Sequence, residues 1–494
     1  MNRNIGAKPF AFVAAIILLI SWIRLDPGDK KQGVSAAGPG AGPIASEIEQ
    51  GGAEDPAALG ETGAAGSGTE AAGPAAAAKQ AAAKQAAASQ SQKAGTTCGK
   101  DNGGATDTGV TANRIKLATT AVLDGPAKSL LEDSPKAMKA VVDKVNQQGG
   151  ICGRLLDLRV VNDSFRAEVG LSAIRSFIDE GYFALPVVPS AEGLGSAIES
   201  GYISRAKIPV IGTDGMRKEQ YGEPYVWPVA SATVTAMRVM AKYGSTKRGA
   251  KTFAIVYDEK YQFGKEGKDA FLDQVKQLGG TAVDGAVVGL NPEDTSYGST
   301  IQKFNEACKG GASCDMVALL LLPETAKKWL QGGANFGGRY TAGAQTLFTD
   351  RFAQDCVLLR PGGECQGFAV WTGYNPPIGP LASKPGVAAY VNDVRAVKPG
   401  MDVNNQFVEG AYLGMTVFVE ALKQVGPNLT RERLKAAMDS MTFNSDLTSP
   451  LTWTVGRHAA NVRSQSFSMT VSQGAFRGWS DEGTGFLLDP AFGG

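Results

Sequence analysis

The stretch from Arg114 to Val161 shows the most regular pattern of apolar and polar positions in the chain. Residues 114–120 and 155–161 are short apolar-rich runs that predict strands. Between them, apolar residues at 137, 141 and 145, with 138 and 142 beside them, form one face of a helix expected over 134–148. Ser134-Pro135 suits its start and Gly149 its end. A strand, a helix and a strand with short links predict a pair of parallel strands. Ligands bind beyond the carboxyl ends of such strands, so we expect binding residues in the loop after the first strand, Leu123–Asp133.

The same alternation continues as far as residue 325. Further strands are expected over 183–188, 208–211, 252–257, 286–288 and 316–322, and helices over 169–180, from 194 to 204, and over 233–243, 266–278 and 300–307. The apolar run 317–322 is typical of a strand covered on both faces. We therefore expect two doubly wound α/β lobes, whose loops at the strand ends face each other across a cleft.

The last third of the chain is expected to return to both lobes. Helices are predicted over 404–425 and after Thr430, and strands over 451–455 and 467–471, with a hairpin at 474–476. The chain would then cross between lobes near Ala230, Thr372 and Leu451, which makes a three-segment hinge. The expected boundaries are 98–229 for the first part of lobe I, 230–372 for lobe II, 373–450 for the return to lobe I, and 451–494 for a C-terminal segment of lobe II and the hinge.

Residues 1–32 are expected to direct export. The apolar run Pro9–Ile23 follows Arg3 and Lys8 and has the length of a signal-peptide core. A small-residue cleavage site does not follow directly, and Val34-Ser35-Ala36 lies unusually far downstream. Both an uncleaved membrane anchor and a cleaved signal therefore stay open, and both place the rest of the chain outside the cytoplasm. A lipid anchor is not expected, because the first cysteine is Cys98.

Residues 33–97 consist largely of Ala, Gly, Ser, Pro and Gln. Such a segment buries too little apolar surface to fold alone. Its Ala-rich part, 75–92, favours partial helix. We expect a linker that holds the folded head clear of a membrane or cell wall; the alternative is a low-complexity tail without a role.

The remaining composition narrows the chemistry. The six cysteines can pair in 15 ways, and proximity favours Cys308–Cys314 and Cys356–Cys365, which leaves Cys98–Cys152. With His458 as the single histidine and no Cys-x-x-Cys, neither a metal site nor histidine-based catalysis is expected. The formal charge of +1 is not that of a nucleic-acid binder. The catalytic serine and zinc motifs are missing too, so we expect neither an enzyme nor a cofactor.

Four phrases of the sequence resemble a known family. They are Gly109–Leu117, Asn146–Arg154, Ile255–Asp258 with Tyr261–Gly264, and Pro450–Trp453. In this order they are similar to the type I periplasmic binding proteins, and more narrowly to the branched-chain amino-acid branch of ABC-transporter solute-binding proteins. The resemblance covers about Cys98 to Phe486. It implies a clamp that captures a small solute between its lobes and delivers it to a membrane permease.

The resemblance also implies a set of ligand-binding residues. In the family, backbone amides and hydroxyls after the third and fourth strands hold the carboxylate of an amino acid, and here these loops contain Ser190, Ala191, Glu192, Thr213 and Asp214. The ammonium group is commonly met by a carboxylate and aromatic rings, for which the candidates are Asp124, Tyr261, Phe263, Glu324 and Gln345. Several of these have simpler interpretations, since Asp214 suits a turn and Glu324 the first turn of a helix.

Two departures from the family pattern bear on the ligand. Glu192 stands where a neutral residue is usual, and Gln345 replaces an acid. They put specificity for branched-chain amino acids in doubt, but not binding in the cleft. The leading hypothesis is a monomeric solute receptor of an ABC importer, and the alternative is a membrane-anchored sensor that uses the same clamp without transport.

Overall fold

A computed structural model describes residue 98 and residues 101–309, 313–336, 340–453, 458 and 461–492. The expected signal or anchor over 1–32 and the linker over 33–97 lie outside the described residues. Within the described part, no helix is both long enough and apolar enough to cross a membrane.

The first sheet is parallel and begins with the predicted strand–helix–strand unit. Strand β1 (Arg114–Ala121) pairs with β2 (Leu155–Asn162) along its whole length, and α3 (Ser134–Gln147) connects them. Single bridges at Ala184 and Leu185 link β1 to β3 (Val210–Ile211), which pairs with β4 (Val226–Trp227). The strand predicted over 183–188 is thus reduced to isolated bridges. Pro186 interrupts it, because proline lacks the N–H that a ladder needs.

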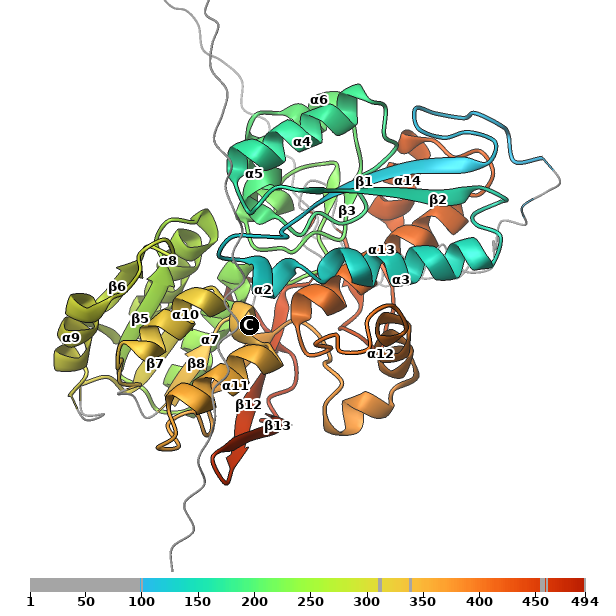
Figure 1. The fold of residues 1–494 in the computed structure, drawn as a ribbon. Helices are drawn as coiled ribbons and strands as arrows, with labels where there is room; N and C mark the ends of the chain where they lie inside the picture. Colours follow the sequence, from blue (N-terminus) through green and yellow to red (C-terminus); the bar gives the residue numbers. More distant parts are fainter. Residues whose placement is uncertain are drawn as a thin grey trace, which may run out of the picture. The chain divides into compact units, whose positions relative to one another are not determined.

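Helices cover both faces of the first sheet (Figure 1). One face carries α4 (Ala167–Asp179), α5 (Ala191–Glu199) and α6 (Tyr202–Ala206), and the other carries α3, α12 (Pro385–Val397), α13 (Gln406–Val425) and α14 (Arg431–Ser440). The neighbouring residues Leu117 and Ala118 belong to the two opposite cores, as the alternation of side chains along a strand requires. Helix α12 was not expected from the sequence, whereas α13 and α14 return to this sheet as predicted.

The second sheet has the strand order β13-β12-β9-β8-β7-β5-β6. Its members are β5 (Thr252–Asp258), β6 (Thr281–Leu290), β7 (Met316–Leu320), β8 (Tyr340–Gly343), β9 (Ala369–Thr372), β12 (Arg463–Ser472) and β13 (Ala475–Asp481), while β14 (Leu487–Leu488) pairs with β12. Strands β5 to β9 are parallel, and β12 joins β9 in antiparallel fashion. Strands from the C-terminal end of the chain therefore complete a sheet begun at residue 252.

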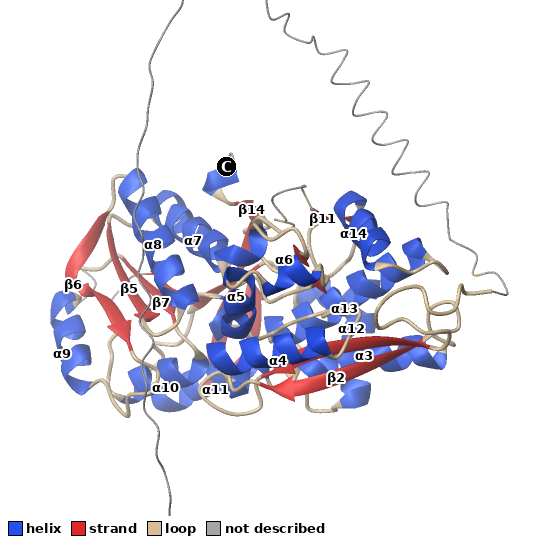
Figure 2. Cartoon of the chain, turned by 90° about the horizontal axis from the view of Figure 1, so that it is seen from above, coloured by secondary structure: helices blue, strands red, loops and turns tan. Residues whose placement is uncertain are grey.

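Phe253 and Ile255 of β5 pack with α7 (Thr233–Lys247) and α8 (Gln262–Gln277). Ala254 and Val256 belong to the opposite core, with α9 (Gly298–Ala307), α10 (Pro323–Gln331) and α11 (Asp350–Leu359). Figure 2 shows the strands β5, β6 and β7 with helices α7 and α8 on one side and α9 and α10 on the other. Several sequence-based boundaries were wrong. Strand β6 is longer than 286–288, α8 begins at Gln262 rather than at residue 266, and α7 ends at Lys247 rather than at residue 243. The single helix expected from 194 to 204 is two helices, α5 and α6.

Three chain segments connect the elements of the two sheets, and one asparagine joins them. Nδ2 of Asn461 donates to the carbonyl of Gly373 at 2.8 Å and to Oγ1 of Thr448 at 3.2 Å. Asn461 also forms a parallel bridge with Ser231. These contacts lie next to the three places where we expect the chain to cross from one lobe to the other.

The disulfides agree with the pairing that proximity favours. The bonded pairs are Cys98–Cys152, Cys308–Cys314 and Cys356–Cys365. No cysteine remains free.

Candidate functional site

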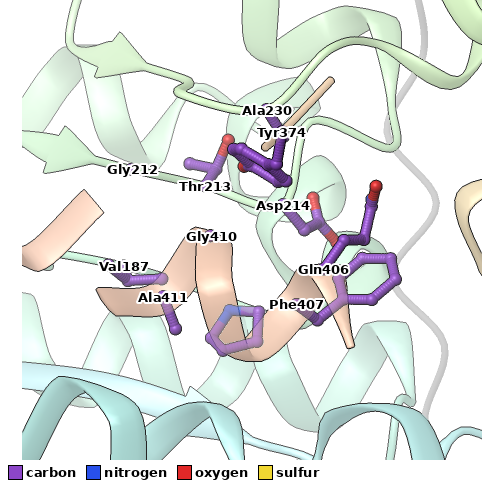
Figure 3. Close-up of a pocket in the computed structure, with 11 residues that line it drawn as sticks. Val187, Gly212, Thr213, Asp214, Ala230, Tyr374, Gln406, Phe407, Gly410 and Ala411 are labelled. Carbon is purple, nitrogen blue, oxygen red and sulfur yellow. The ribbon is translucent and has the colours of Figure 1, made fainter. Parts of the chain in front are cut away.

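A small cavity lies where β3 ends and α13 begins (Figure 3). Its volume is about 10 Å³, close to the room that one water molecule needs. The lining includes the polar residues Thr213, Asp214, Tyr374 and Gln406 and the apolar residues Val187, Ala230, Phe407 and Ala411. The cavity is therefore at the carboxyl ends of parallel strands, where the sequence placed the binding loops.

A close approach of two glycines brings α13 to this position. Gly212 follows β3 with a φ of +71°, and a Cβ atom on it would stand 2.3 Å from Cα of Gly414 in α13. A side chain at either position would push the helix away from the loop that carries Thr213 and Asp214. The cavity thus depends on backbone packing that only glycine permits.

Asp214 is the most unusual group at the cavity. Its Oδ1 accepts the backbone N–H of Met216 at 3.1 Å and Nε2 of Gln220 at 3.0 Å. Its Oδ2 is buried and has no hydrogen-bond partner among the described residues. Burial, and then repulsion by Glu192, raises the pKa of Asp214 to about 7, although its hydrogen bonds and Arg217 act in the opposite direction.

Thr213 and Ser190 are both buried, but they differ in their bonding. Thr213 Oγ1 donates to Oε1 of Gln220 at 2.5 Å. Ser190 occupies the N-cap position of α5 without making the capping hydrogen bond, and Ala191 beside it is fully buried. The hydroxyl of Thr213 is therefore already engaged. Ser190 keeps its hydroxyl near the carboxyl group of Asp163, whose pKa is raised by burial, and the Ser190 hydroxyl opposes this shift.

Glu192 connects the first sheet with a helix of the second. It lies in the first turn of α5, 3.8 Å from Arg217, which also contacts Glu199 at 2.5 Å and Glu219 at 3.1 Å. Burial raises the pKa of Glu192, and Arg217 and the backbone N–H of Gln262 oppose this shift. Since Gln262 is the first residue of α8, the carboxylate of Glu192 meets the N-terminus of a helix that covers the second sheet.

Aromatic rings from loops of both sheets meet beside the cavity. The rings of Phe165 and Tyr261 are 5.0 Å apart in an edge-to-face contact, and Tyr261 stacks on Phe263 at 5.8 Å. All three belong to one buried apolar cluster with Met216 and Phe407. Apolar side chains from loops of both sheets therefore pack together beside the cavity.

The remaining predicted residues divide into two groups. Gln345 is buried after β8, where Nε2 donates to Oγ1 of Thr233 at 3.1 Å and Oε1 has no partner among the described residues. Asp124 is exposed and accepts a hydrogen bond from Asn162 at 3.0 Å. Glu324 has a side chain that is 38% exposed and lies 3.8 Å from Arg351. Of the ten predicted residues, Thr213 and Asp214 thus line the cavity, and the other eight do not. Glu324 occupies the first turn of α10, as its simpler interpretation has it.

Some lining residues were missed by the sequence analysis. Gln406 and Phe407 open α13, whose N-cap is Asn405, and Tyr374 follows the segment that leaves β9. The N-cap of a predicted helix beside a strand-end loop was a usable signal for Gln406. Nothing local pointed to Tyr374. The described residues contain no cluster of side chains able to hold a metal ion.

Comparisons with known proteins agree with this architecture. A family model described as periplasmic binding protein matches residues 114–475. A Leu/Ile/Val-binding protein homolog 3 of Brucella melitensis biotype 1 is 23% identical over 265 residues, which is 49% of this chain and 71% of the relative.

Two solved structures show the same fold. A fatty acid ABC transporter substrate-binding protein from Thermomonospora curvata superposes with a TM-score of 0.64 at 18% identity, covering 78% of this chain and 93% of its own. The branched-chain amino acid transporter substrate binding protein LivJ from Streptococcus pneumoniae, in complex with isoleucine, gives 0.61 at 14% identity, covering 76% and 100%.

The family is one of solute-binding proteins, which agrees with the expectation that the chain is not an enzyme. The matched region begins with β1 and ends at the start of β13, so that it contains the cavity, the first sheet and the second sheet as far as β12. The chain belongs to the periplasmic binding protein family.

Proposed function

We propose that this protein is the extracytoplasmic solute receptor of an ABC importer and that it captures an amino acid or a similar small solute by closing two lobes around it. Lobe I consists of the first sheet with its helices (residues 98–229 and 373–450), and lobe II consists of the second sheet with its helices (residues 230–372 and 451–494). The observation that carries the proposal is the buried apolar cluster in which Phe165 and Met216 of lobe I pack against Tyr261 and Phe263 of lobe II.

The contacts around Asn461 suit a hinge. Three segments near Ser231, Gly373 and Thr448 are held together by one side chain. Segments fixed to one another at a single place can bend while the lobes stay in register. A solute that touches both lobes stabilises the closed form by its higher affinity for that form.

The names of relatives support transport of small organic solutes. One relative is named for leucine, isoleucine and valine, and two similar structures are named for a fatty acid and for isoleucine. The alternative, an anchored sensor, gains no support from them. The proposal includes a membrane permease as partner, a monomeric receptor, and either an anchor or a cleaved signal over residues 1–32.

The proposal is tested by measuring binding and closure together. The purified protein is unfolded, dialysed and refolded to remove bound solute, and then titrated calorimetrically with amino acids, amines and short carboxylic acids. We expect at least one of them to bind and to reduce the radius of gyration in small-angle X-ray scattering. A correctly folded protein that binds none of these solutes and does not change its dimensions would contradict the proposal.

A further inference from the structure

The cavity beside α13 holds an acceptor without a donor. Asp214 is 7% exposed, lines the cavity, and leaves Oδ2 without a hydrogen-bond partner among the described residues. A buried acceptor in this condition costs free energy until a donor reaches it. In its ionised form Asp214 offers this oxygen to a cationic donor and repels a second carboxylate. Gln345, on the lobe II side, does not line the cavity, but its Oε1 atom likewise has no partner among the described residues.

The charged groups near the cavity also favour a cationic ligand over an anionic one. The charged groups that act on Asp214 are Glu192 and Arg217, and Tyr221 and Tyr374 lie within reach of its charge. Arg217 is the cation among them, and it already contacts three carboxylates, those of Glu192, Glu199 and Glu219. Glu192 also places a negative charge in the first turn of α5, the helix start at which a ligand carboxylate would have to bind. An anionic head group is therefore disfavoured both beside Asp214 and at the start of α5, next to Glu192.

The size of the cavity and its surroundings define the rest of the ligand. A space of about 10 Å³ accepts a group of the size of water, such as an ammonium head. Phe407 lines the cavity and also belongs to the apolar cluster with Phe165, Tyr261 and Phe263. A ligand that enters while the lobes are open would place its head in the cavity and its body among these side chains as the lobes close around it. Aromatic faces favour a cationic neighbour.

We propose that the solute captured by this protein is a small primary amine without a carboxylate, whose ammonium group binds Oδ2 of Asp214 and whose apolar body packs against Phe165, Tyr261 and Phe407. This inference rests on the proposed function and deepens it. It assigns Asp214 as the residue that selects the charge of the ligand.

Three probes separate the possibilities, because they divide leucine into its parts. The amine 3-methylbutylamine keeps the side chain and the ammonium group, 4-methylpentanoate keeps the side chain and the carboxylate, and leucine carries both charges. Calorimetric titration of the solute-stripped protein should show tightest binding for 3-methylbutylamine and weakest for 4-methylpentanoate. Tighter binding of leucine or of 4-methylpentanoate than of the amine overturns the inference and leaves the proposed function standing. If none of the three binds but another solute does, the inference alone fails; if no solute binds at all, the proposed function fails.

A variant tests the role of Asp214. Asp214→Asn should weaken binding of 3-methylbutylamine about 10- to 100-fold. Glu409→Gln is the matched control, since it removes another buried carboxyl of raised pKa that does not line the cavity, and it should leave the affinity unchanged. Equal affinities in wild type and Asp214→Asn would overturn the inference.

The pH dependence gives a readout that a merely structural role would not produce. Because the pKa of Asp214 in the free protein is about 7, binding of a cation must release a proton from it below that pH. The affinity should then rise about tenfold for each pH unit between about 5 and 7, since an alkylamine stays charged throughout. Titrations in buffers of different ionisation enthalpy count the released proton. Asp214→Asn should abolish both effects, and an affinity of wild type that is independent of pH would contradict the inference.

Discussion

Oδ2 of Asp402 accepts the backbone N–H of Asp350 at 2.7 Å, and so joins the loop before α13 to the first residue of α11. Nδ2 of Asn404 returns the contact by donating to Oδ1 of Asp350 at 3.0 Å. A carboxylate at the N-terminus of a helix is favourable, because the first N–H groups of the helix have no partners within it. Glu192 makes the corresponding contact with the start of α8. Acids of lobe I therefore meet the first residues of two lobe II helices.

Removing the Asp402 carboxylate should favour the open form. We expect Asp402→Ala to destabilise the closed arrangement by about 1–2 kcal/mol, the usual cost of losing a helix cap. The radius of gyration of the unliganded protein should rise, and the affinity for a captured solute should fall about tenfold. Asp402→Asn keeps an oxygen acceptor and should have a smaller effect. Scattering curves that are identical for Asp402→Ala and wild type would show that this contact does not control closure.

The buried carboxyl of Asp258 should make stability depend on pH. Its Oδ2 accepts the backbone N–H of Leu322 at 2.6 Å, and burial raises its pKa to about 8 against the opposing effect of this hydrogen bond. The folded protein then holds a proton that the unfolded chain, with a carboxyl pKa of about 3.9, has released. The stabilisation is complete below about pH 4 and is lost as the pH rises to about 8.

Asp258→Asn removes this titration and provides the test. Melting temperatures measured between pH 5 and pH 9 should fall for wild type relative to the variant, by several degrees over the range. The two proteins share every other ionisable group, so parallel melting curves would mean that Asp258 titrates at an ordinary carboxyl pKa.

The disulfides should contribute unequally to stability. Cys98–Cys152 spans 54 positions and Cys308–Cys314 spans 6. In the chain-entropy description, the longer loop removes more freedom from the unfolded state, so we expect losses of about 4 and about 2 kcal/mol for the respective double serine variants. Chemical unfolding of each variant measures the difference. A larger loss for the shorter loop would indicate that strain or packing, rather than chain entropy, governs these bonds.

The contact between Gly212 and Gly414 should be needed for binding as well as for stability. In Gly414→Ala the new methyl group would stand 2.7 Å from Cα of Gly212, and backbone cannot easily yield. We expect the free energy of unfolding to fall by about 1–3 kcal/mol and solute affinity to fall with it, because the displaced loop carries Thr213 and Asp214.

Gly298→Ala is the control for that substitution. A Cβ atom at Gly298, the first residue of α9, meets nothing within 4 Å. Its stability and solute affinity should match those of wild type. Equal behaviour of the two alanine variants would show that the close approach in α13 is not required.

The periodic elements could be predicted from the sequence because each carries its own signal. The apolar face of α3 and its flanking Pro135 and Gly149 fixed that helix, and the apolar run at 316–322 fixed β7. Helices α11 and α12 were missed, as was the full length of β6, whose exposed positions mask the strand pattern. The short segment at 183–188 failed as a strand because of Pro186.

The candidate site was predictable only in part. Strand-end loops pointed to Thr213 and Asp214, which line the cavity, and to Ser190, which does not. Tyr374 and Gln406 reach the cavity through the hinge and the return of α13, which local sequence does not encode. His458, the single histidine, is buried and stacks on Trp227 with ring centres 4.9 Å apart, which its local sequence does not indicate. Long-range packing decided each of these positions.

The pairing of β9 with β12 has a consequence for biosynthesis. Strand β12 follows β9 by some ninety positions, and the intervening residues supply three helices of the other sheet. Strands β5 to β9 can therefore pair early, but a nascent chain cannot add the strands beyond β9 until its last segments have emerged. Until then one edge of β9 stays unpaired, and an unpaired strand edge is a place where an incompletely synthesised chain can aggregate.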